Sequence, residues 1–202
     1  MLDEVSGSTA QDSSGNNRHG TIGGTPNWAA GVKGNALAFD GLTNYLDVDG
    51  EIANGSLSLT LWLMARDIPY ASGTRAVMHN DVWQAGSLHL HLNTSSLLNF
   101  DTNGRTDVPS STSLSAERWY HVAYTYNSDT GEATIYLDGV LDNTASGTGG
   151  AMFFGPLNFG AYQNNSRFYN GVMDDIRIYG RVLSYAEVAG LAGRTKPIEK
   201  PF

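Results

Sequence analysis

The stretch Leu57-Ser58-Leu59-Thr60-Leu61-Trp62-Leu63-Met64 alternates a leucine with one other residue throughout its length. Successive side chains of a β-strand point to opposite faces, so this spacing places the leucines on one face and Ser, Thr, Trp and Met on the other. The pattern predicts a strand with one buried side and one half-open side.

The same alternation recurs along the chain. In residues 87–93 the leucines share one parity, and His89 and His91 share the other. Turn clusters rich in Gly, Asn, Asp and Ser separate further strand candidates. These candidates are 45–49, 75–79, 96–101, 119–127, 132–138, 156–160 and 171–179. With 24 glycines and only 16% charged residues, the composition is that of a turn-rich all-β protein rather than a helical bundle.

One short helix is predicted near the C-terminus. Ser184 and Glu187 have the spacing of a capping box, Val188 and Leu191 form an apolar stripe, and Gly193 offers a stop. Residues 194–202 are polar and contain two prolines, so they are expected to be a linker toward a further part of a longer protein. Residues 1–193 are then one domain.

Composition excludes several classes of function. The chain has no cysteine, which excludes disulfides, zinc-thiolate sites and thiol nucleophiles. Its net charge of -8 disfavours nonspecific binding to nucleic acid or anionic lipid. No apolar run approaches the ~20 residues that a membrane-spanning helix needs. The first four residues lack the basic start of an export signal, so a secreted or cell-surface location requires a signal outside this chain.

Several ordered motifs together resemble a bacterial laminin-G-like domain of the concanavalin A-like lectin/glucanase superfamily. The motifs are DSSGNNRHGT (12–21), ALAFDG (36–41), WYHVA (119–123), IYLDG (135–139), GVMDDIRIY (171–179) and RVLS (181–184). The resemblance covers about residues 2–193. It implies an antiparallel, two-sheet jelly-roll β-sandwich with one concave and one convex sheet, and ligands that are mostly glycans. Because this fold carries both binding domains and glycan-cleaving enzymes, it does not decide the function.

The sequence favours a protein without catalytic activity. Retaining glucanases of the resembled superfamily carry Glu-x-Asp-x-x-Glu on one strand, whereas the glutamates here are scattered. Asp174 and Asp175 are adjacent, so in a regular strand they point to opposite faces and cannot act as a pair. Residues 160–163 (GAYQ) resemble a fragment of an alginate-lyase motif whose other parts are absent.

Polar and aromatic residues opposite the buried faces predict a glycan-binding surface, since sugars need flat apolar area beside hydrogen-bonding groups. The predicted contacts are Trp62, His79, His89, His91, Asn99 and His121 on the concave sheet, with Trp83, Tyr162, Gln163, Asn164 and Arg167 from loops. Two alternatives stay open. The histidines and Trp62 are ordinary packing residues of the sandwich, or His89, His91 and His121 hold zinc.

A structural calcium ion is a further expectation. In the resembled family, calcium commonly joins an N-terminal segment to the closing strand, and by matching position its ligands here are Asp40, Asp175, the Gly41 carbonyl and Asp12. The competing interpretation is that aspartates in Asp-Gly and Asp-Ser turns accept hydrogen bonds from their own backbone and need no ion.

The favoured function is therefore a non-catalytic carbohydrate-binding module that binds a polysaccharide or glycan beside a catalytic or surface domain of a secreted protein. Neither nucleic acid nor membrane insertion is expected. A cell-adhesion or protein-interaction domain of the laminin-G type is the alternative. A divergent glycan hydrolase or lyase that uses the histidines comes third.

Overall fold

The computed structural model describes residues 2–51, 53–80, 82–163 and 166–194. Its strands are β1 (Thr9–Ala10), β2 (Gly20–Gly23), β3 (Asn27–Ala30), β4 (Asn35–Asp40), β5 (Tyr45–Val48), β6 (Ala53–Gly55), β7 (Leu57–Ala65), β8 (Arg75–Asn80), β9 (Leu88–Leu92), β10 (Leu98–Thr102), β11 (Val108–Pro109), β12 (Tyr120–Tyr126), β13 (Glu132–Leu137), β14 (Val140–Ser146), β15 (Met152–Phe154), β16 (Leu157–Phe159) and β17 (Asn170–Tyr179). The helix α1 spans Tyr185–Leu191. Most of the predicted linker, residues 195–202, lies outside the described residues.

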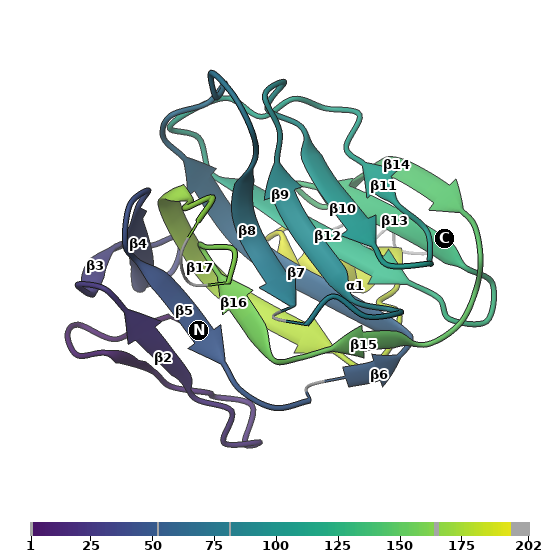
Figure 1. Cartoon of the computed structure of the whole chain (residues 1–202), viewed down its shortest axis with the longest axis horizontal. Helices are drawn as coiled ribbons and strands as arrows, with labels where there is room; N and C mark the ends of the chain where they lie inside the picture. Colours follow the sequence, from purple (N-terminus) through teal and green to yellow (C-terminus); the bar gives the residue numbers. More distant parts are fainter. Residues whose placement is uncertain (1, 52, 81, 164–165, 195–202) are drawn as a thin grey trace, which may run out of the picture.

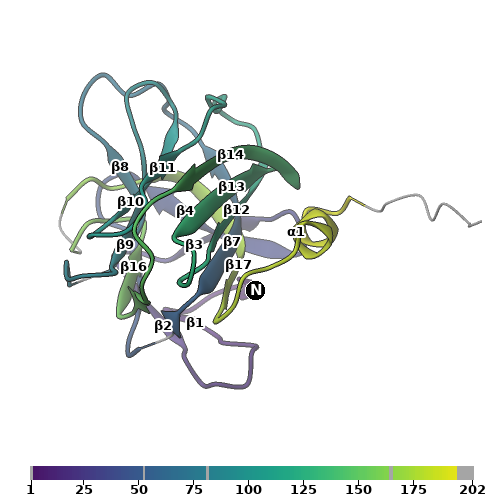
Figure 2. The same ribbon diagram turned by 90° about the vertical axis from the view of Figure 1, so that its right-hand side faces the viewer.

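Two antiparallel sheets form the sandwich, which confirms the predicted fold class. The eight-stranded sheet has the order β1-β2-β5-β16-β8-β9-β10-β11, and the seven-stranded sheet has the order β14-β13-β12-β7-β17-β4-β3. Figures 1 and 2 show the two layers from the front and from the side. A small third sheet pairs β6 with β15.

The core lies between the layers and follows the predicted alternation. All four leucines of β7 are fully buried, as are the three leucines of β9 in the facing sheet. Phe100 of β10 stacks on Tyr124 of β12, with the ring centroids 4.5 Å apart. This contact joins the layers directly, because β10 and β12 belong to different sheets.

The outer face of β7 is more buried than the alternation predicts. Ser58 and Thr60 are both buried. The Ser58 hydroxyl donates to the Arg181 carbonyl at 2.8 Å and accepts from the Leu183 backbone N–H at 2.9 Å. The chain leading to α1 therefore covers this end of the sheet.

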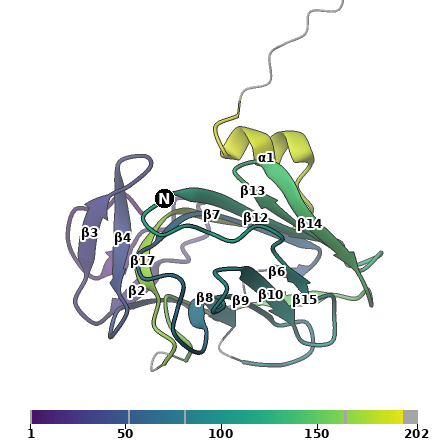
Figure 3. The same ribbon diagram turned by 90° about the horizontal axis from the view of Figure 1, so that it is seen from above.

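The helix begins with the predicted capping box. The Ser184 side chain accepts from the Glu187 backbone N–H, and the Glu187 carboxylate accepts from the Ser184 N–H. Val188 and Leu183 pack on Ala123 of the seven-stranded sheet, so α1 lies outside that layer (Figure 3). The described residues contain no helix that is long and apolar enough to cross a membrane; α1 has seven residues.

Candidate functional site

A row of polar side chains crosses the outer face of the eight-stranded sheet. The strand registers place Asp47 of β5 opposite Asn158 of β16, Asn158 opposite His79 of β8, His79 opposite His89 of β9, and His89 opposite Asp101 of β10. The Asn158 amide donates to the Asp47 carboxylate at 2.5 Å. The alternation in β8 and β9 thus directs two of the predicted site histidines to the same face.

His79 is the buried centre of this row. It is only 1% exposed, and its ring centroid lies 4.0 Å from that of His89 and 4.8 Å from that of Tyr162. Neither ring nitrogen has a hydrogen-bond partner among the described residues. Burial, together with the nearby His89, His91 and Arg167, lowers the pKa of His79 to about 2. The ring is therefore neutral, and it supports its neighbours rather than facing solvent.

Trp83 covers His89 and remains half exposed. The two ring centroids are 4.1 Å apart at an interplanar angle of 42°, and Trp83 is 47% exposed. The Tyr162 ring stands edge-on to the same imidazole at 5.7 Å. Burial lowers the pKa of His89 to about 4. A hydrogen bond with the Asn80 backbone raises this pKa, but by less than burial lowers it. A neutral imidazole thus lies beneath an accessible indole.

The loop after β16 holds Tyr162 on this face. Arg167 belongs to the same loop, and its guanidinium carbon lies 4.9 Å from the centroid of the Tyr162 ring. The Arg167 carbonyl accepts the Ala76 N–H of β8 at 2.8 Å, and the Tyr162 N–H donates to the Ser166 carbonyl at 2.8 Å. Gly160 starts the loop with φ +83°, and a Cβ there would lie 2.2 Å from the Phe39 ring. Only glycine fits this turn without displacing the core.

The remaining predicted contacts of this face lie at its β10 side and in the loop. His91 Nδ1 is 3.5 Å from an Asp101 carboxylate oxygen, and the Asp101 side chain is 44% exposed. Burial lowers the pKa of His91 although Asp101 opposes the shift. Asn99 is half buried and accepts from the Asn93 amide at 3.2 Å. Gln163 is exposed in the loop, whereas Asn164 lies outside the described residues.

Trp62 and His121 do not belong to this face, so the prediction of one shared surface is wrong for them. They lie on neighbouring strands of the seven-stranded sheet, with ring centroids 5.3 Å apart. The zinc alternative fails for the same reason, because His121 is in the other layer from His89 and His91. Within the described part of the chain, no three His, Asp or Glu side chains form a metal-binding group.

Two of the predicted calcium ligands, Asp12 and Asp40, already accept hydrogen bonds from their own turns. Asp12 accepts the backbone N–H groups of Ser14 and Arg18 at 2.8 and 3.0 Å, and these hydrogen bonds lower its pKa to about 2. At Asp40, partial burial raises the pKa, but the N–H groups of residues 42–44 outweigh that effect and lower it to about 2. This geometry matches the alternative of self-capped aspartate turns.

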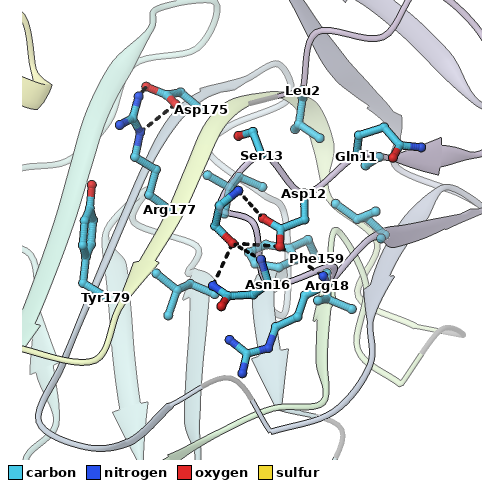
Figure 4. Close-up of a pocket in the computed structure, with 17 residues that line it drawn as sticks. Leu2, Gln11, Asp12, Ser13, Asn16, Arg18, Phe159, Asp175, Arg177 and Tyr179 are labelled. Atoms are coloured by element: carbon cyan, nitrogen blue, oxygen red, sulfur yellow. Dashed lines mark hydrogen bonds and ion pairs between the residues drawn. The ribbon is translucent and has the colours of Figure 1, made fainter.

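The four predicted calcium ligands also do not converge. Asp175 binds Arg177 through two hydrogen bonds of 2.8 and 2.9 Å, and it lines the same pocket as Asp12 (Figure 4). Asp40 lies opposite Asn170, five residues along β17 from Asp175. At about 3.3 Å per strand residue the separation is roughly 16 Å. Asp40 and Gly41 therefore cannot share one ion with Asp175.

Solved structures with the same fold include several binding domains. Domain 4 of AbnA, a GH43 extracellular arabinanase from Geobacillus stearothermophilus, in complex with arabinotriose, has 19% identity and a TM-score of 0.71, covering 90% of this chain and 92% of that one. A heptameric SAP-like pentraxin from Limulus polyphemus has 14% identity and a TM-score of 0.63, covering 81% and 84%. The binding domain of botulinum neurotoxin serotype D has 16% identity and a TM-score of 0.75, covering 96% of this chain and 50% of that chain.

The sequence itself gives a family assignment. No protein of curated function matches the chain. Residues 39–189, well over half of the chain, match the laminin-G family described as the concanavalin A-like lectin/glucanases superfamily. The match runs from the end of β4 into α1, so it includes strands of both sheets together with Trp83 and Tyr162, and it leaves out β1 to β3. The chain therefore belongs to the laminin-G branch of the concanavalin A-like lectin/glucanase superfamily.

Proposed function

We propose that this domain is a non-catalytic glycan-binding module that binds sugar at the Trp83–Tyr162 surface, which consists of Trp83, Tyr162, Arg167 and Asp101. The observation that carries the proposal is the half-exposed Trp83 side chain, whose ring centroid lies 4.1 Å from that of the half-buried His89. An indole fixed in this way offers a rigid apolar plane at little entropic cost when a sugar ring packs on it.

Hydrogen-bonding groups surround that plane. Arg167 is exposed beside Tyr162 and supplies donors, while the partly exposed Asp101 carboxylate supplies acceptors. A glycan presents hydroxyls that need both kinds of partner around an apolar ring face. His79 and His89 then act from beneath, as positioning residues that keep the aromatic rings in place.

The relatives support this class of ligand. The arabinanase domain is described with arabinotriose, and a botulinum neurotoxin DC binding domain of 17% identity is described with SialylT. We extend the same class to this chain, as part of a larger secreted or cell-surface protein in which a neighbouring domain acts on or anchors to the glycan.

The test is a binding titration against soluble oligosaccharides chosen by an insoluble-polysaccharide pull-down. Trp83→Ala is expected to weaken binding at least about tenfold, since a central aromatic contact contributes more than about 1.4 kcal/mol. Tyr185→Ala is the matched control, because Tyr185 is 45% exposed but lies on α1 outside the other sheet. Equal affinity of wild type and Trp83→Ala, with a glycan bound by both, would remove this surface from the function.

A further inference from the structure

A pocket of about 400 Å³ opens where β17 continues past the strand beside it. β4 pairs with β17 only from Asn170 to Met173, although β17 runs on to Tyr179. Along residues 174–179, the described part of the chain places no strand on that side. The N-terminal segment crosses the gap instead and supplies Leu2, residues 10–14, Asn16 and Arg18 to the pocket lining (Figure 4).

The floor of the pocket is apolar and comes from both sheets. Its side chains are Leu2, Leu46, Val48, Phe159, Ile176 and Ile178. Val48, Ile176 and Ile178 are only partly buried, although they pack against the main core. The interior of the sandwich therefore reaches solvent here, and the volume lies within the range of small-molecule sites, roughly 300–1,000 Å³.

Four charged side chains line the rim, and three of them are already engaged. Asp175 and Arg177 neutralise each other through two hydrogen bonds. The Asp12 carboxylate is occupied by the N–H groups of its own turn and by the Ser14 hydroxyl. The exposed Arg18 guanidinium has no hydrogen-bond or ion-pair partner among the residues described. The four charges sum to zero, and of these four side chains Arg18 is the one whose charged group keeps all its hydrogen-bond donors unused among the described residues.

We propose that this pocket binds a small anionic amphiphile, whose apolar body fills the space between the sheets and whose carboxylate or sulfonate meets the Arg18 guanidinium. A planar guanidinium suits an oxyanion because it can donate two parallel hydrogen bonds. The apolar floor suits a hydrocarbon or aromatic body better than a sugar. The site is separate from the Trp83–Tyr162 surface, whose residues come from the loops after β8 and β16 and from β10, and none of them lines the pocket.

Two fluorescent probes that differ by one anionic group test the proposal. They are 1-anilinonaphthalene-8-sulfonate and its uncharged counterpart N-phenyl-1-naphthylamine, each titrated into the native protein. Arg18→Gln is expected to weaken binding of the sulfonate about tenfold and to leave binding of the uncharged probe unchanged. Arg66→Gln is the matched control, because Arg66 is exposed and follows the end of β7 that is far from Tyr179.

Val48→Trp is expected to fill the pocket and abolish binding of both probes. Contacts between probe protons and the methyl groups of Ile176 and Ile178 in nuclear Overhauser spectra give the location without any variant. Failure of the sulfonate probe to bind below millimolar concentration would overturn the proposal. So would equal affinity in wild type and Arg18→Gln, or contacts that map to a different surface. None of these outcomes bears on the glycan titration, which reports on the other site.

Discussion

The buried His79 should make the stability of this domain depend on pH. Its folded-state pKa of about 2 lies far below the ordinary value of 6.5, because the ring is buried and lacks a hydrogen-bond partner among the described residues. Below pH 6.5 the unfolded chain binds a proton at this position and the folded chain does not. The contribution of His79 to stability is therefore complete above about pH 6.5 and is lost as the pH falls toward 2.

The expected loss of stability follows from the uptake of one proton by the unfolded chain. Each pH unit below 6.5 lowers the free energy of unfolding by about 1.4 kcal/mol, so about 2 kcal/mol is lost between pH 6.5 and 5. Replacing His79 by Phe keeps a ring near His89 and Tyr162 but removes the titration. The wild type should thus lose about 2 kcal/mol relative to His79→Phe over this range.

Urea unfolding followed by tryptophan fluorescence at pH 7.5, 6.5, 5.5 and 5.0 measures this difference. Comparing the two proteins cancels groups that titrate in both, including Asp101, whose raised pKa acts in the opposite direction. His79→Gln packs less well but also cannot take up a proton, so it should show the same flattened profile. Parallel stability profiles for wild type and both variants would show that His79 is not the buried neutral group described above.

Three further predictions concern the helix cap, the site loop and calcium. Ser184→Ala removes half of the capping box and should cost about 1 kcal/mol, or roughly 2–4 °C in melting temperature by calorimetry. Gly160→Ala should cost at least about 2 kcal/mol, because its Cβ meets the Phe39 ring at positive φ, whereas Gly180→Ala, with open space around it, should stay within about 0.5 kcal/mol. Since Asp12 and Asp40 are held by their own turns and Asp175 by Arg177, 1 mM calcium and 1 mM EDTA should give melting temperatures within about 1 °C. A clear rise with calcium would restore the calcium site expected from the sequence.

Local patterns in the sequence predicted β5, β7 to β10, β12, β13, β16 and β17, but gave no candidate for the other strands, β14 among them. The leucine alternation in β7 and β9 predicted both strands and their buried sides, and Ser184 with Glu187 predicted the start of α1. Alternation fixes the face of a strand, but it carries no information about which sheet the strand joins. For this reason the sequence placed Trp62 and His121 beside the other histidines, although β7 and β12 lie in the opposite layer.

Features that depend on long-range register could not be predicted. β1 and β11 have only two residues each and carry no periodic pattern. The covering of His79 by Tyr162 depends on a loop that returns to β8 from β16, far along the chain. The pocket beside β17 depends on β4 ending its pairing at Met173, which is set by the partners of both strands rather than by either sequence alone.

The outermost strands of the eight-stranded sheet are short, and this limits aggregation through the sheet edges. β1 and β11, which form its two margins, offer only two residues of backbone each to an incoming chain. A foreign strand needs a longer run of free N–H and C=O groups to add to a sheet and seed aggregation. Many copies of this domain at high local concentration are thus protected against forming a fibril through this sheet.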